Sequence, residues 1–134
     1  MFLYHARLAI QDLSDEFNQP YLVSSYDDFS FLINSVWRQY GGWYSGIPSE
    51  LKPPSLFDMG SAYIDMAGGK ENLLLFLQSL LAENKYKEAS VLIDSISAVE
   101  PDFYRDIKNA IYTFLADNEP SLMAKGIYNF NLDT

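Results

Sequence analysis

The sequence predicts an all-α fold, a single domain of six or seven helices over residues 1–134, and three observations support this. The chain of 134 residues suffices for one domain and is too short for two comfortable ones. Hydrophobic residues make up 49% of it and aromatic residues 16%, which provides ample core material. Apolar residues recur at three- and four-residue steps almost throughout, which is the period of an amphipathic helix.

Residues 1–26 are expected to form an N-terminal helix and a connector. Apolar side chains follow helical spacing over residues 2–17, and Pro20 cannot continue the hydrogen bonding of a helix. Asp27 or Asp28 can then cap a second helix. The apolar face of this second helix is predicted to comprise Phe29, Leu32, Ile33, Val36, Trp37 and Tyr40.

Glycines and prolines mark the next boundaries. Gly41 and Gly42 can end the second helix, because glycine adopts left-handed backbone angles without strain. Residues 45–55 contain three prolines, so this loop is expected to run extended or in turns. Ser55 can cap a third helix over residues 56–66, which the glycine pair of "AGGKE" would close.

Four further helices are predicted over residues 70–83, 85–100, 101–117 and 120–130. Pro101 suits the first turn of its helix, where no backbone donor is needed. Their predicted inward residues are Leu73, Phe76, Leu77, Leu80 and Leu81, then Tyr86, Ala89, Leu92, Ile93, Ile96 and Val99, then Ile107, Ala110, Ile111 and Phe114.

Three details of these helices are also predicted. Leu74 and Leu75 fall off the stripe of residues 70–83, so that helix is expected to be covered on two sides. Gly126 is expected to end or kink the last helix. Short connections predict antiparallel hairpins, and residues 84–117 resemble one helix pair of a tetratricopeptide repeat, too little for a repeat array.

The charge balance excludes several partners. Nine basic against eighteen acidic residues give a net charge of −9, and no basic run exists, so binding to nucleic acid is not expected. An acidic DNA mimic, or a small acidic protein that neutralises a basic partner, remains an alternative. No segment reaches eighteen uninterrupted apolar residues and the start lacks signal-peptide features, so no membrane span and a cytoplasmic location are expected.

The chain offers little for catalysis by itself. It has no cysteine, which excludes disulfides and thiol nucleophiles. His5 is the one histidine and is expected at the surface of the first helix, so no His-rich zinc site can be built. Asp12, Asp15 and Glu16 cluster nearby but lack a histidine partner, and no metal site is predicted there.

The stretch "WRQYGGWYSGIP", residues 37–48, is unusually aromatic for a connector. One explanation is structural: the helix stops here, and aromatic side chains anchor the turn, with Trp43 buried as large rings usually are. The other explanation is functional: the turn presents Arg38 and Tyr44 to a ligand. The residues alone leave both open.

Together with "MAGGKENLL", "EASVLIDSISAVEPD" and "SLMAKGIY", this stretch resembles the dimerisation domain of alkyl sulfatases over roughly residues 27–128. The resemblance implies a helical homodimerisation domain that follows a zinc-bearing catalytic domain of metallo-β-lactamase fold. It implies that Arg38 and Tyr44 contact the sulfate group of the substrate, which suits a guanidinium fork and a phenol donor. The implied structural turn consists of Gly41, Gly42, Trp43, Gly46 and Pro48.

The chain departs from the family pattern in three ways. Ser45 and Ile47 stand where the family turn has Asp and Asn. The stretch "SVLIDSISAV" lacks the family's His and Trp, and a single histidine cannot supply its two-zinc motif. We therefore expect a non-catalytic dimerisation module without a cofactor of its own, with zinc only in a catalytic domain supplied elsewhere. The alternative is a tetratricopeptide-like adaptor that holds another protein.

Overall fold

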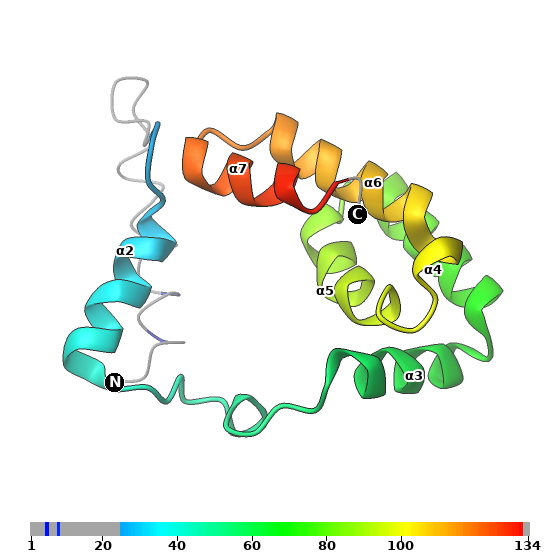
Figure 1. The fold of residues 1–134 in the computed structure, drawn as a ribbon, viewed down its shortest axis with the longest axis horizontal. Helices are drawn as coiled ribbons and strands as arrows, with labels where there is room; N and C mark the ends of the chain where they lie inside the picture. Colours follow the sequence, from blue (N-terminus) through cyan, green and yellow to red (C-terminus); the bar gives the residue numbers. More distant parts are fainter. Residues whose placement is uncertain (1–4, 6–7, 9–24, 133–134) are drawn as a thin grey trace. The chain divides into compact units, whose positions relative to one another are not determined.

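The computed structural model describes His5, Leu8 and residues 25–132, and within these it is all-α (Figure 1). The described residues form six α-helices and two short helical turns, and no strand occurs among them. Apart from His5 and Leu8, the predicted helix over residues 2–17 lies outside the described residues, and so does the acidic cluster of Asp12, Asp15 and Glu16. The exposed side chain of His5 agrees with its expected surface position.

Contacts divide the chain into two compact units. The first comprises Met1–Pro53 and Pro120–Ala124, and the second comprises Pro54–Glu119 and Lys125–Thr134. The sequence predicts that residues 1–134 form a single domain whose first 26 residues are a helix and a connector. That assignment stays a prediction.

In the first unit, helix α2 (Phe29–Val36) begins where the sequence predicts. Asp28 has an extended backbone, and its carboxylate accepts a hydrogen bond from the Ser30 amide at 2.7 Å. This side chain satisfies one of the amides that the first turn leaves without an intrahelical partner. Asp28 rather than Asp27 is therefore the cap.

The end of α2 differs in one detail from the prediction. The helix passes into a π-helical turn, η1 (Trp37–Gly41), and only then stops at Gly42, whose φ is +90°. Gly41 belongs to η1 and has no positive φ. The loop that follows runs as predicted, with a single 3-10 turn, η2 (Pro48–Glu50).

The apolar face predicted for the second helix is only partly covered. Leu32, Val36 and Tyr40 are exposed, which corrects the expectation for these three residues, whereas Ile33 and Trp37 are partly buried. Elsewhere in the first unit, Ser121 and the start of α7 (Leu122–Phe130) are tied to residues 25–26. The amides of Leu122 and Met123 donate to the Ser25 and Tyr26 carbonyls at 2.9 and 3.1 Å.

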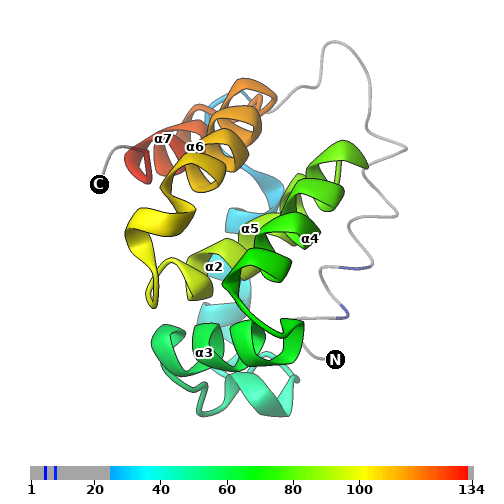
Figure 2. The ribbon, with the colours of Figure 1, turned by 90° about the vertical axis from the view of Figure 1, so that its right-hand side faces the viewer.

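The second unit contains α3 (Leu56–Ala67), α4 (Lys70–Ala82), α5 (Tyr86–Ile96), α6 (Pro101–Asp117) and the C-terminal part of α7 (Figure 2). Ser55 caps α3 through a hydrogen bond from the Asp58 amide at 3.1 Å, as predicted. Gly68 closes that helix in the left-handed conformation, and Pro101 is the first residue of α6. Gly126 lies inside α7 and does not end it.

The core of this unit lies among α4, α5 and α6. Its buried residues are Leu73, Leu77, Leu80, Ala89, Ile93, Ile96, Tyr104, Ile107, Ile111, Tyr112 and Leu115. On α6 the covered face is rotated from the predicted one, since Ala110 and Phe114 are exposed and two tyrosines are buried. On α4, Leu74 packs against the core while Leu75 is exposed, so the prediction that this helix is covered on two sides holds for Leu74 and fails for Leu75.

A close approach between α3 and α5 depends on Gly60. A Cβ added there would collide with the Ser95 carbonyl oxygen and lie 2.8 Å from both the Ser95 carbonyl carbon and Val99 Cγ2. Backbone atoms cannot rotate away from such a contact. Only glycine therefore allows these two helices to pack at this separation.

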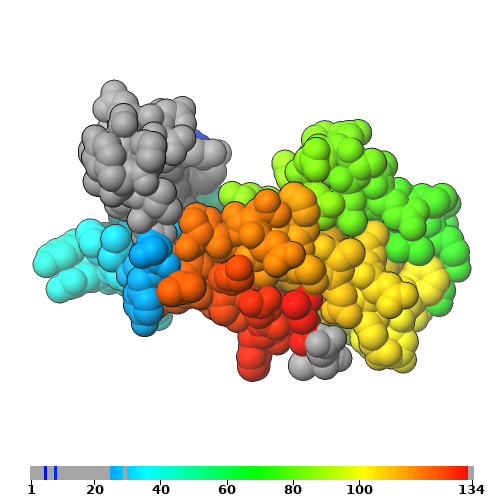
Figure 3. Space-filling view, turned by 90° about the horizontal axis from the view of Figure 1, so that it is seen from above, coloured from blue at the N-terminus to red at the C-terminus, as the bar shows by residue number. Residues whose placement is uncertain are grey.

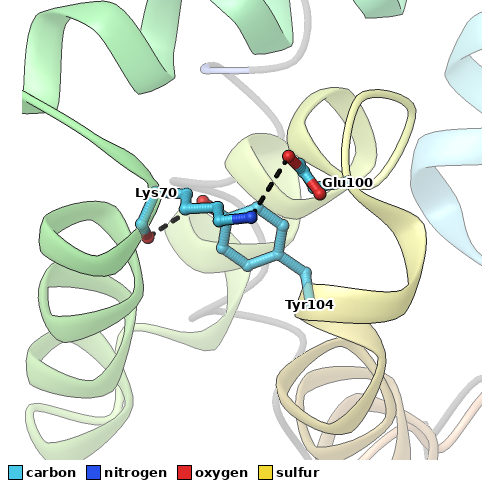
Figure 4. A network of polar contacts seen from close by, with 3 residues as sticks. All are labelled: Lys70, Glu100 and Tyr104. Carbon is cyan, nitrogen blue, oxygen red and sulfur yellow. Dashed lines mark hydrogen bonds and ion pairs between the residues drawn. The ribbon is translucent and has the colours of Figure 1, made fainter.

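A polar network joins the starts of α4 and α6 (Figure 4). The hydroxyl of Tyr104 donates to the Lys70 carbonyl at 3.0 Å, and Lys70 Nζ lies 3.3 Å from Glu100 Oε1. The same ammonium group stands 4.8 Å from the centre of the Phe103 ring. Burial, with smaller contributions from Glu100 and Glu71, raises the pKa of Tyr104.

A second tyrosine joins α5, α6 and α7. The Tyr112 hydroxyl donates to the Asp94 carboxylate, and its ring centre lies 6.0 Å from that of Tyr128. Burial and the hydrogen bond to Asp94 raise the pKa of Tyr112, which keeps the phenol protonated as a donor. Figure 3 shows α6, coloured from yellow to orange, beside the C-terminal part of α7, in red.

Candidate functional site

The predicted sulfate-contacting residues lie in one turn of the first unit. Arg38 is in η1 and is exposed, and no hydrogen bond or ion pair joins its guanidinium group to another described residue. Tyr44 follows the glycine pair and is partly buried. Among the described residues, no carboxylate therefore has to be displaced for an anion to reach Arg38.

Trp37 holds this turn together. Its indole Nε1 donates to the Tyr44 carbonyl at 3.3 Å, which links the end of the helical segment to the residues after the glycine pair. Its ring lies so close to Gly41 that an added Cβ would stand 2.5 Å from Trp37 Cδ2. Gly41 thus gives room to an indole ring, whereas Gly42 supplies a backbone angle.

The two departures from the family turn have a local effect. Ser45 Oγ accepts a hydrogen bond from the Ile47 amide at 3.3 Å, the kind of contact with which short polar side chains stabilise turns. Gly46 lies between them with a φ of +96°. The serine therefore retains a turn-forming hydrogen bond, while Ile47 contributes no polar side chain.

The exposure of Trp43 differs from the prediction. It is 80% exposed, although a buried anchor was expected, and its ring centre lies 6.2 Å from that of Tyr44 at an angle of 54°. Trp37 takes the anchoring role because its indole donor reaches a backbone carbonyl. The turn thus presents an indole ring and a guanidinium group at its surface.

The second unit has a feature that sequence analysis missed: an apolar hollow of about 330 Å³, which we call the α3–α4 groove. It is lined by Tyr63, Met66, Ala67, Asn72, Leu73, Phe76 and Leu92. Met66 is 79% exposed and Phe76 is 51% exposed. Helical periodicity placed Phe76 on an apolar stripe but could not distinguish a core position from a surface position.

The described part of the chain has neither a metal-binding cluster nor a membrane-spanning helix. No group of three or more His, Asp or Glu residues able to hold a metal ion occurs in residues 25–132 or at His5. Within the same residues, no helix is long and apolar enough to cross a membrane.

Comparison with known proteins gives a consistent result. The family model described as "Alkyl sulfatase dimerisation" matches residues 13–133. An (R)-specific secondary-alkylsulfatase from Pseudomonas sp. is 27% identical over 81 residues, which is 60% of this chain and 12% of that protein.

A solved structure agrees in fold. A double mutant of the sec-alkyl sulfatase PisA1 superposes with a TM-score of 0.68 at 21% sequence identity, covering 78% of this chain and 17% of that one. The chain therefore spans between about an eighth and a sixth of the length of these two relatives.

Proposed function

Because the chain belongs to the alkyl sulfatase dimerisation family, we propose that it is the self-associating, non-catalytic module of an alkyl sulfatase. The match over residues 13–133 carries this proposal, since it includes every described helix. The two sulfatase relatives support the same assignment. Hydrolysis of the sulfate ester would fall to a zinc-dependent catalytic domain of metallo-β-lactamase fold supplied elsewhere.

The surface of the second unit supports self-association. Met66 and Phe76 are both exposed, although each is apolar, and both line the α3–α4 groove. Single exposed apolar residues are normal, but grouped ones beside a hollow are typical of surfaces that bind another protein. A homodimer would cover such residues through a symmetric interface in which both copies use the same patch.

The turn of the first unit is proposed to contribute to substrate binding. Arg38 would pair its guanidinium fork with two sulfate oxygens, and the Tyr44 hydroxyl would add a neutral donor. The exposure of Arg38 supports this role, as does the Trp37–Tyr44 hydrogen bond that holds both residues in one turn. The sulfate itself would sit in the catalytic domain.

Light scattering over a concentration series tests self-association. We expect a molar mass of twice 15.3 kDa that persists on dilution. A mass of one chain at every concentration would contradict the proposal. It would favour the second candidate, a tetratricopeptide-like adaptor that uses the α3–α4 groove to hold a different protein.

Titration with an alkyl sulfate tests the turn separately. Arg38→Ala should weaken binding, whereas Arg105→Ala, which removes the same charge from an exposed position on α6, should leave it unchanged. Losing a charged hydrogen bond predicts a change of roughly tenfold. Equal binding by wild type and Arg38→Ala would restrict any role of Arg38 to a site completed by the catalytic domain.

A further inference from the structure

We propose that the α3–α4 groove is the surface to which a second copy of this chain binds, an inference that rests on the proposed self-association. Two helices of the same unit supply the exposed side chains at its edges: Met66 from α3 and Phe76 from α4. Leu73 and Leu92 form part of the lining between them. The groove therefore lies within one compact unit.

The groove is self-complementary in the way a two-fold interface requires. In such an interface the same patch must offer both the protruding group and the cavity that receives it. Here Phe76 is half exposed beside a hollow of about 330 Å³, and Met66 has an unbranched, adaptable side chain. Each copy can thus insert an aromatic ring into the hollow of the other.

Charge favours a second copy over a basic partner. The chain carries a net charge of −9, so two copies repel each other wherever acidic surfaces meet. None of the groove residues is charged. An uncharged apolar face on an acidic chain suits contact with an identical chain, whereas a basic partner would be bound through carboxylates.

The amide of Asn72 in the lining has its donors satisfied within the chain. Asn72 Nδ2 donates to the Ala67 and Gly68 carbonyls at 3.2 and 3.3 Å, at the C-terminus of α3. Covering a polar group is costly mainly when its hydrogen bonds are left unmade. Because these amide donors are already used within the chain, a partner that covers Asn72 has only the Oδ1 acceptor left to satisfy.

The first test places a charge in the groove. Phe76→Glu should weaken the dimer of the 134-residue chain about 30-fold or more, since it puts an unpaired carboxylate into an apolar contact between acidic chains. Phe130→Glu is the matched control, because Phe130 is exposed on α7 and does not line the groove. Dissociation constants would be measured by analytical ultracentrifugation, and circular dichroism would confirm the helical fold of each variant.

The outcomes separate this inference from the proposed function. A wild-type dimer lost in Phe76→Glu and kept in Phe130→Glu supports the groove as the interface. A dimer that survives Phe76→Glu overturns the groove while the proposed self-association stands. A wild-type chain that is monomeric at every concentration overturns both.

A second measurement does not depend on how Phe76→Glu folds. The chain has no cysteine, so Met66→Cys would introduce a single thiol at the groove edge, and Val91→Cys would introduce one at an exposed site on α5 outside the groove. If a second copy covers the groove, labelling of Met66→Cys should slow as protein concentration rises, while labelling of Val91→Cys stays constant. Concentration-independent labelling of Met66→Cys in a chain that dimerises would overturn the inference.

Discussion

Replacing Gly60 with alanine tests how the second unit is packed. An alanine Cβ would collide with the Ser95 carbonyl oxygen and stand 2.8 Å from Val99 Cγ2, where ordinary contacts are 3.4–4 Å. The valine side chain can turn away, but the carbonyl belongs to α5 and cannot. Helices α3 and α5 must therefore move apart by several tenths of an ångström.

The size of the effect follows from two opposing terms. Alanine favours a helix over glycine by about 1 kcal/mol. Overpacking a well-packed contact costs about 1–3 kcal/mol and sometimes more, and a backbone contact belongs at the upper end. We expect Gly60→Ala to lower the free energy of unfolding by about 2 kcal/mol, because the steric cost exceeds the gain in propensity.

Gly126→Ala is the matched control. Gly126 also lies within a helix, α7, but nothing stands within 4 Å of an added Cβ. Its substitution should stabilise the protein by up to about 1 kcal/mol. Urea denaturation followed by circular dichroism would compare both variants with wild type. If Gly60→Ala were as stable as wild type, the close packing of α3 on α5 would be refuted.

Two further predictions concern polar contacts. Tyr104→Phe should lower stability by about 1–2 kcal/mol, because the Lys70 carbonyl loses a donor 3.0 Å away. The raised pKa of Tyr104 adds a pH dependence: above about pH 10 the unfolded chain releases the phenol proton while the folded chain keeps it, so wild-type stability should fall more steeply towards about pH 11 than that of Tyr104→Phe. Urea titrations at about pH 10 and about pH 11 would measure the free energy of unfolding of both proteins. An equal loss of stability in wild type and Tyr104→Phe between these pH values would contradict this. Ser55→Ala should cost about 1 kcal/mol, because the Asp58 amide loses its cap, and an unchanged urea midpoint would count against that role.

Sequence patterns located the starts and ends of helices well because capping is local. Asp28 and Ser55 reach amides two or three residues ahead, and Gly68 adopts its left-handed angle in response to the helix it ends. Pro101 needs no partner beyond its own helix. Such signals lie within about one turn of the chain, so they are visible in the amino-acid order.

Burial was harder to predict, since it depends on which helices meet. Periodicity placed Phe76 and Phe114 on inward faces, yet both are exposed, whereas Tyr112 is buried. An amphipathic helix can be rotated about its own axis, and only the neighbouring helices determine which of its residues become buried. For the same reason Trp43 was expected inside and is exposed, because Trp37 provides the anchor of the turn.

The sequence by itself determined that the chain is helical, where most of the described helices begin, and to which family it belongs, because propensity, capping and linear motifs reside in neighbouring residues. Only the tertiary structure decided that Gly60 must be glycine, that Tyr104 joins two helices and that Phe76 stands beside an apolar groove. Each of these features joins residues that are distant in the chain. Their energies depend on distances that no local pattern contains.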